Sequence, residues 1–372
     1  MIDSQHTADE LLAILRLQHI PNIGDVIAKK LIAHCGSPSA VFDEKRETLL
    51  KIDGVGTHTI KYLFDSAYLK AAEAEYGYII NNNIQCTYFK DIDYPKHLKH
   101  CIDAPILLFK KGKMDFRDRK IISVVGTRNI TGYGMAFCEQ FVKDIAPLNP
   151  IIVSGFAYGV DICIQKEAIK HGLQTIGCLA HGLNQIYPKV HAKYQTEVCD
   201  NGGFFTEFWS TSNPERENFL KRNRVIAGMS EATVVIESAE KGGSLVTADI
   251  AHGYNRDVFA VPGRSSDKYS IGCNNLIKQQ KAHMLTSAAD LVYMLNWDVD
   301  DRKSKTVQKQ LFVDLDETEQ TIYTYLQQNG KQLLDGIALN CHIPVYKTSA
   351  ILLAMEMKGV IRPLPGKLFE AV

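Results

Sequence analysis

Six short apolar runs alternate with stretches of helical periodicity between about residues 119 and 297. Strands that are apolar throughout and separated by helices are typical of a parallel sheet covered on both faces. The pattern therefore predicts a Rossmann-like, doubly wound α/β core with a mainly parallel sheet. The expected strands are Ile121–Val125, Ile151–Val153, Thr175–Leu179, Gly203–Thr206, Thr233–Ile236 and Val258–Val261.

Two further strand-like runs, Cys86–Phe89 and Ile106–Phe109, precede this core in a segment punctuated by Pro95 and Pro105. We expect them to add an edge to the same sheet. The Rossmann-like domain, with this N-terminal extension, is predicted to span residues 77–297.

Residues 1–76 combine short helices with two similar turns, in which a Gly or Asn and a second Gly alternate with apolar residues. Gly and Asn tolerate the positive φ that such turns need. Ile20–Asp25 precedes an expected helix over Val26–Ile32, and Ile52–Thr57 precedes one over His58–Leu63. The repeat resembles a tandem helix-hairpin-helix pair, whose amides approach DNA phosphates. The candidate contacts are Gly24, Gly54 and Gly56.

A polar linker, residues 298–315, separates the core from residues 316–372. In this last segment, three amphipathic patterns and a terminal hairpin at residues 359–369 predict a winged-helix domain. The expected helices are Glu317–Gln328, Leu333–Leu339 and Ile343–Lys358.

The roles of the two terminal domains stay open. The expected recognition helix carries only Lys347 and Lys358 as cations, which favours protein contact or packing over DNA binding. In the first hairpin, Asn22 stands in place of the usual first glycine, which favours a structural role or a platform for a partner.

Glycine-bearing turns follow four of the six expected strands. Ligands bind doubly wound sheets at the carboxyl ends of the strands, and glycines let a backbone or a phosphate come close there. We therefore expect one shared groove along that edge. Its turns are Gly126–Arg128, Ser154–Asp161, Lys241–Thr247 and Pro262–Arg264.

Cations, amides and an aromatic residue gather in the stretch Asn218–Gly228, which is expected to form the entrance of a helix, with Pro214 suited to its first turn. A helix N-terminus favours anions, and arginine forks add bidentate contacts to phosphate. Phe219 among these groups suggests a nucleic base as well. In the alternative interpretation, Arg222 and Arg224 are a solvated surface pair and Phe219 is a core residue.

Composition limits the class of protein further. The 372 residues are 45% hydrophobic and 23% charged, as in globular proteins of two or three domains. Lys+Arg and Asp+Glu both number 42, so a nucleic acid must be held by a local patch. Nine cysteines without a C-x-x-C pair indicate neither disulfides nor a zinc site, and no run approaches membrane-spanning length. These features favour a reduced cytoplasm.

Signatures of catalysis and of a cofactor are weak. The first turn is not G-x-G-x-x-G, and no acidic residue stands at Ser154-Gly155 to hold a ribose, so no nicotinamide cofactor is expected. The histidines are scattered, without a Ser-His-Asp series at nucleophile-elbow spacing. Asp161 and Glu207 could form an acid/base pair, but a helix cap explains Asp161 more simply.

Seven motifs stand in a fixed order between residues 125 and 277. They are Val125–Arg128, Ser154–Asp161, Ile186–Pro188, Arg222–Gly228, Gly243–Ala248, Val258–Gly263 and Gly272–Ile277. In this order they resemble the DNA-processing protein A family (DprA, also called Smf). The flanking hairpin and winged-helix domains also resemble that family's additions, so the resemblance covers nearly the whole chain.

The resemblance implies a non-enzymatic, cytoplasmic protein that binds single-stranded DNA. Family members protect incoming strands during natural transformation and help to load the RecA recombinase, working as dimers through the Rossmann-like domain. Glycine-turn amides and arginines would hold the backbone while Phe219 stacks on a base. The residues expected to bind DNA are Arg128, Ser154, Gly155, Arg216, Phe219, Lys221, Arg222, Asn223, Arg224, Lys241, Gly242, Gly243 and Ser244.

Three positions depart from the family pattern. Gln165 stands where a histidine is usual, Ala180-His181 replaces Gly-Thr or Gly-Cys, and Asn255 replaces the glycine before Arg256. We expect these departures to affect the detailed shape of the groove and not its class.

Two other functions stay open from the sequence. A nucleotide-binding or phosphoribohydrolase-type Rossmann enzyme would carry P-G-G-x-G-T-x-x-E. The segment Lys241–Ala248 lacks both the glycine-threonine step and the glutamate, and a general acid or base needs such a carboxylate. The other function is a scaffold that binds only proteins through its terminal domains. In that case, changing Arg128 or Arg222 would leave the affinity for DNA unchanged.

Overall fold

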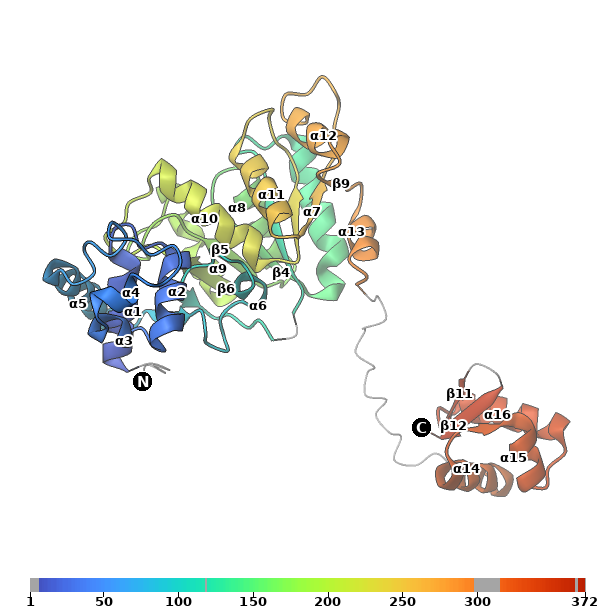
Figure 1. Cartoon of the computed structure of the whole chain (residues 1–372). Coiled ribbons are helices and arrows are strands. Elements are labelled where there is room, and N and C mark those ends of the chain that lie inside the picture. Colours follow the sequence, from blue (N-terminus) through green and yellow to red (C-terminus); the bar gives the residue numbers. More distant parts are fainter. Residues whose placement is uncertain (1–6, 118, 298–314, 365–366, 372) are drawn as a thin grey trace. The chain divides into compact units, whose positions relative to one another are not determined.

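The structure, a computed structural model, describes residues 7–117, 119–297, 315–364 and 367–371 (Figure 1). The chain forms two compact units, Met1–Asp298 and Val299–Val372. The linker predicted at residues 298–315 lies outside the described residues except for its last position.

Five helices open the first unit. The first predicted turn is present, because Asn22 has a φ of 68° and the next helix begins at Asp25. Buried residues of the first and fifth helices share one hydrophobic core with Leu107 of the sheet and with Trp209. The domain boundary predicted after residue 76 falls inside the fifth helix. The helices are α1 (Ala8–His19), α2 (Asp25–Cys35), α3 (Ala40–Asp43), α4 (Arg46–Leu49) and α5 (Ser66–Asn81).

The helix predicted over His58–Leu63 is wrong. This segment forms consecutive turns, in which the Ile60 amide donates to Gly56 O (3.3 Å) and the Leu63 amide donates to Ile60 O (3.2 Å). Threonine and histidine, which are prominent here, have weak helix propensity. A regular helix begins only after the Asp65 side chain caps α5.

A nine-stranded sheet forms the centre of the first unit, in the order β1-β2-β6-β5-β4-β3-β7-β8-β9. Neighbours from β6 to β9 along this order are parallel, whereas β1, β2 and β6 pair antiparallel. The six predicted core strands and the predicted edge pair are confirmed, and only the two-residue β9 was not predicted. The strands are β1 (Gln85–Tyr88), β2 (Leu107–Gly112), β3 (Ile121–Val125), β4 (Ile151–Ser154), β5 (Thr175–Cys178), β6 (Gly202–Thr206), β7 (Ala232–Val235), β8 (Asp257–Ala260) and β9 (His283–Met284).

Helices cover both faces of this sheet, which confirms the doubly wound fold. Along β3, Ile121 and Val125 belong to a core shared with α10 and α11, whereas Ile122 and Val124 belong to one shared with α7, α8 and α13. The helices are α6 (Lys96–Lys99), α7 (Gly132–Ile145), α8 (Val160–Lys170), α9 (Gln195–Asp200), α10 (Arg216–Met229), α11 (Gly243–Gly253), α12 (Ile271–Lys278) and α13 (Ala288–Met294), with 3-10 helices η1 (Ala146–Leu148) and η2 (Lys189–Tyr194).

The second unit has the predicted winged-helix fold. Its first helix begins with a capping box, in which Asp316 accepts a hydrogen bond from the Glu319 amide (2.8 Å). Ile322, Ile337 and Leu352 bring the three helices into one buried core. The elements are α14 (Glu317–Asn329), β10 (Gln332–Leu333), α15 (Leu334–Asn340), α16 (Val345–Met357), β11 (Ile361–Leu364) and β12 (Leu368–Ala371).

Over the described part of the chain, no single helix has the length and apolar character needed to cross a membrane. By length and composition alone, α15 and residues 345–356 of α16 would do so only together, as a pair bent by 109°.

Candidate nucleic-acid interface

The candidate groove lies at β3, where the winding of the sheet changes direction. β3 pairs with β4 on one side and with β7 on the other. Such a switch point opens a crevice at the carboxyl ends of the strands. A cavity of about 740 Å³ lies there, lined by the turns after β3 and β7 and by α10. The predicted residues in its lining are Arg128, Arg216, Phe219, Arg222, Asn223, Lys241, Gly242, Gly243 and Ser244.

Phe219 is the central aromatic residue of this groove. The Cζ atoms of Arg128 and Arg222 lie 5.3 and 5.7 Å from its ring centroid. The Tyr187 ring lies 5.8 Å away, at an interplanar angle of 60°. Because the two arginines flank the Phe219 ring, which stays partly exposed, the ring offers a fixed apolar surface inside the groove.

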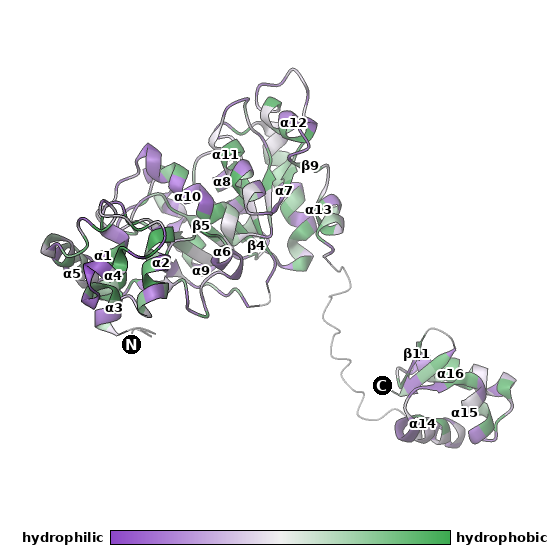
Figure 2. Cartoon of the chain, in the orientation of Figure 1, coloured by the Kyte–Doolittle hydropathy of each residue, from purple (hydrophilic) through white to green (hydrophobic). Residues whose placement is uncertain are grey.

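Three cations of the groove, Arg128, Arg216 and Lys241, are exposed. Within the described ranges, no carboxylate forms an ion pair with any of them. Arg216 is the first residue of α10, a largely hydrophilic helix (Figure 2), and Lys241 precedes the N-terminus of α11. Asp161 is the one acidic residue among the described residues that line the groove. The groove is therefore locally positive, although the net charge of the chain is zero.

Arg222, by contrast, is buried, with 5% of its surface exposed. Its Nη1 donates to Gly155 O (2.7 Å) and to Cys178 O, near the ends of β4 and β5. Burial lowers the pKa of this guanidinium, and the nearby Asp161 carboxylate opposes the shift. A Cβ atom at Gly155 would lie 2.8 Å from both Nη atoms, so glycine makes room for the arginine. Arg222 thus ties two strand ends together beside Phe219.

Other predicted site residues also hold the groove in shape. Ser154 Oγ is buried and donates to the backbone of β3 at 2.6 Å. Ser244 Oγ donates to Ser238 Oγ (2.9 Å), and the side-chain Nδ2 of Asn223 donates to Gly243 O (3.4 Å). These side chains fix the turns, whereas the exposed backbone of the Gly242–Gly243 turn is open to a ligand.

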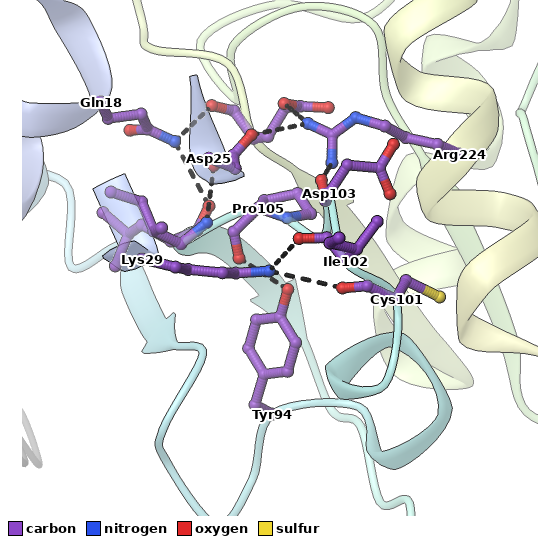
Figure 3. Close-up of polar contacts among 12 residues, drawn as sticks. Gln18, Asp25, Lys29, Tyr94, Cys101, Ile102, Asp103, Pro105 and Arg224 are labelled. Carbon is purple, nitrogen blue, oxygen red and sulfur yellow. Dashed lines mark hydrogen bonds and ion pairs between the residues drawn. The ribbon is translucent and has the colours of Figure 1, made fainter. Parts of the chain in front are cut away.

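Arg224 lies outside the groove, in a junction with the N-terminal helices (Figure 3). Its guanidinium pairs with Asp25 of α2 (3.1 Å) and with Glu207, and it donates to Asp103 O. In the same junction, Lys29 Nζ donates to the backbone of the segment before β2. The alternative of a solvated arginine pair is therefore wrong, because both arginines have buried partners.

Glu207 and Asp161 do not form an acid/base pair, because they line different cavities. Burial raises the pKa of Glu207 to about 7, against the attraction of Arg224. Burial also raises the pKa of Asp161, whose carboxylate accepts from the amides of Gly155 (3.1 Å) and Ala157 (3.3 Å). Asp161 thus holds the loop before α8 through these hydrogen bonds. The sequence suggested that Asp161 caps this helix, but the N-cap residue of α8 is Gly159.

The hairpin glycines lie outside the groove. Gly24 and Lys221 line a second cavity of about 460 Å³, together with three carboxylate-bearing residues. Gly54 has a φ of 80° and packs beside Lys30, and the Gly56 amide donates to a threonine hydroxyl at 3.4 Å. DNA contact by the two hairpins stays a prediction.

Comparison with known proteins connects these features to one family. The family model for DNA recombination-mediator protein A matches residues 85–296, which is more than half of the chain. The chain belongs to this family. A second model, the DprA winged helix domain, matches residues 310–367. The DNA processing protein DprA of Bacillus subtilis (strain 168) is 38% identical over 199 residues, which cover 53% of this chain and 67% of that protein.

Two solved structures of DNA processing protein A are similar to this member of the recombination-mediator protein A family. The Streptococcus pneumoniae protein has a TM-score of 0.66 and 27% identity, and the match covers 77% of this chain and 98% of that one. The Helicobacter pylori protein has a TM-score of 0.51 and 27% identity, with 57% and 96% covered. That Helicobacter pylori structure concerns a single-stranded DNA binding mode.

The departures from the pattern of the recombination-mediator protein A family lie away from the groove lining. Asn255 has a φ of 55°, a left-handed conformation that Asn tolerates better than other residues with a side chain. Gln165 is fully buried, and its side-chain amide has no hydrogen-bond partner among the described residues. His181 is also buried, with Nδ1 2.9 Å from Gly182 O.

The sequence did not predict that Tyr187 lies beside Phe219 at the edge of the groove. The signal was available, because Ile186–Pro188 is one of the motifs that resemble the family. Its ring, however, meets Phe219 only in the folded chain, through a contact between residues 32 positions apart that no local pattern reveals. Leu220 and Val246, which lie within the predicted helix entrance and the predicted turn Lys241–Thr247, add exposed apolar surface to the cavity.

Proposed function

We propose that this member of the recombination-mediator protein A family binds single-stranded DNA in the groove at the carboxyl ends of β3 and β7. The observation that carries the proposal is the partly exposed Phe219 ring, fixed beside Arg128 in a groove that the exposed cations Arg216 and Lys241 also line. The single-strand binding of the Helicobacter pylori relative supports it.

Different residues of the groove contact the phosphates and the bases of the DNA strand. Arg128, Arg216, Lys241 and the amides at the N-terminus of α11 attract phosphates. Phe219 stacks on a base, which contributes about 1–3 kcal/mol and accepts any base. Each phosphate contact adds roughly 0.7 to the slope of log affinity against log salt for a single strand. The site therefore binds single strands with little sequence preference.

In this proposal the protein protects incoming strands during natural transformation and helps to load RecA, acting as a homodimer through the Rossmann-like domain. It does so without catalysis. The phosphoribohydrolase alternative needs a carboxylate free to act as acid or base. Asp161 has the one carboxylate in the described groove lining. This carboxylate already accepts hydrogen bonds from two backbone amides.

Arg128→Ala tests the groove directly. We expect weaker binding of a labelled thymine oligonucleotide at every salt concentration, with a salt slope smaller by roughly 0.7, because one phosphate contact is lost. The measurement is fluorescence anisotropy across a salt series, with single-stranded and duplex DNA. Lys143→Ala is the matched control, because Lys143 is exposed on α7 outside the groove lining and its loss removes the same charge.

The proposal fails on either of two results. One is wild-type binding that shows no preference for the single strand. The other is an Arg128→Ala variant that binds like the Lys143→Ala control, which would leave a small nucleotide or a protein partner as the ligand.

A further inference from the structure

Two exposed tyrosines beside the groove have no role in the function proposed above. Tyr187 is 39% exposed, and its ring centroid lies 5.8 Å from that of Phe219. Tyr158 is 46% exposed, and its ring centroid lies 5.1 Å from that of His191 in η2. Tyr187 precedes η2 and Tyr158 packs on it, so this short helix connects the two rings.

The loop that carries Tyr158 is tied to the first turn of the groove. The Val160 amide donates to Thr127 O (3.1 Å). On the other side, Nδ1 of the buried His191 lies 3.0 Å from Phe156 O. Phe156 itself has a φ of 57°, an uncommon conformation for a bulky residue, and its ring is fully buried. These contacts hold Tyr158 in a fixed place between the groove and η2.

The surface around these tyrosines suits a polyanion. Lys166, Lys189 and Lys193 are exposed there, and the stretch from residue 182 to residue 196 contains no Asp or Glu. The Nζ atoms of Lys166 and Lys193 lie 5.5 and 5.0 Å from the ring centroid of Tyr194. Aromatic rings interspersed with cations are the combination that sequence-tolerant single-strand binding uses.

The other side of α10 offers a poorer route for a strand. The cavity beside Lys221 is also lined by Asp25, Asp103 and Glu207, and Arg224 is the cation that already pairs with two of these carboxylates. A phosphate that entered this cavity would be repelled by the nearby carboxylates. A strand that leaves the groove therefore finds favourable charge along η2.

We propose that Tyr187 and Tyr158 form a second base-stacking surface for nucleotides that leave the Phe219 groove along η2. This inference rests on the proposed function, because it requires the groove to hold a single strand. Its consequence is a binding site longer than the groove alone provides.

The test measures affinity as a function of oligonucleotide length. Thymine oligonucleotides of about 4 to 16 nucleotides, the range of site sizes known for single-strand binding folds, are titrated against full-length protein. The variant combines Tyr158→Leu with Tyr187→Leu. The matched control is Tyr293→Leu, because Tyr293 is 80% exposed on α13 and outside the groove lining.

We expect the double variant to bind the longest oligonucleotide at least about fivefold more weakly, the lower limit for one lost stacking contact, and the shortest within about twofold of wild type. Tyr293→Leu should match wild type at every length. A double Tyr158→Phe and Tyr187→Phe variant keeps both rings and should restore the affinity. With abasic DNA, the wild type and the leucine variant should bind equally.

Unchanged affinity of the leucine variant at the greatest length would overturn the inference. So would an equal loss at all lengths, because the tyrosines would then only support the groove. Failure of the proposed function itself is distinguishable, since Arg128→Ala would then bind the shortest oligonucleotide as well as wild type does.

Discussion

Three arginines of α10 illustrate how far a residue's role depends on distant partners. Arg216 is exposed at the groove, Arg222 holds the ends of β4 and β5, and Arg224 joins the N-terminal helices to the sheet. The sequence placed all three on one helix and predicted the same DNA-binding role for each. It could not separate them, because the carbonyls and carboxylates that occupy Arg222 and Arg224 come from other parts of the chain.

Arg222→Ala should therefore act on stability before it acts on DNA. We expect the free energy of unfolding to fall by roughly 3 kcal/mol or more, because two buried carbonyls lose a charged donor. Arg128→Ala, at an exposed position, should change it by no more than about 0.5 kcal/mol. Urea unfolding of the two variants beside wild type measures the difference. Equal stability of the two variants would contradict the structural role of Arg222.

The buried Glu207 carboxylate should make the stability of the fold depend on pH. Its pKa is raised to about 7 by burial, above the roughly 4.3 expected for an unfolded chain. The folded state therefore binds the proton more tightly, and stability falls as pH rises between these two values, by up to roughly 4 kcal/mol from this group. Above about pH 7 the effect is complete.

Glu207→Gln removes this titration and keeps the shape of the side chain. In urea unfolding at several pH values, we expect the wild type to lose stability relative to the variant as pH rises from about 4.5 to about 7. Arg224, Asp25 and Lys221 are the charged groups that act on Glu207. A stability difference that does not vary with pH would show that Glu207 is ionised throughout this range.

At the scale of elements, the N-terminus of α11 is the part of the groove built from backbone alone. Gly243 is its first residue, and the space around a Cβ atom at this position is open. Gly243→Asp should stabilise the helix by about 0.3–1 kcal/mol through the helix dipole. The same charge should weaken single-strand binding, because it repels a phosphate at this end of the helix.

Thermal unfolding and oligonucleotide binding are the two measurements for this variant, with Gly243→Ala as the uncharged control. The opposite signs of the two effects exclude simple misfolding as the cause. If Gly243→Asp bound DNA as well as Gly243→Ala, the amides of α11 would not face a phosphate.

Elements were predicted well where a local pattern defines them. The core strands were found because each is apolar throughout, and α14 because its pattern is amphipathic. The helix predicted at His58–Leu63 was wrong because the hairpin repeat suggested a helix that the local propensities do not support. β9 has only two residues, too few to form a pattern, and it exists through its pairing with β8.

At the scale of the whole molecule, a chain with no net charge contains one locally positive groove. The sequence predicted the doubly wound sheet, the winged-helix fold of the last segment and a shared groove at the carboxyl ends of the strands. It did not predict the junction of Figure 3, in which Arg224 and Lys29 connect α10 and α2 to the segment before β2. That junction depends on long-range ion pairs, which leave no periodic signal in a sequence.

The central claim is that a base stacks on Phe219, and photo-crosslinking tests it most directly. A thymine oligonucleotide carrying one 5-iodouracil is bound to the full-length protein and irradiated, and the crosslinked residue is mapped by mass spectrometry. We predict a crosslink at Phe219 that is lost in Phe219→Leu and unchanged in Tyr293→Leu. Crosslinks confined to the N-terminal hairpins or to the winged-helix unit would contradict the account.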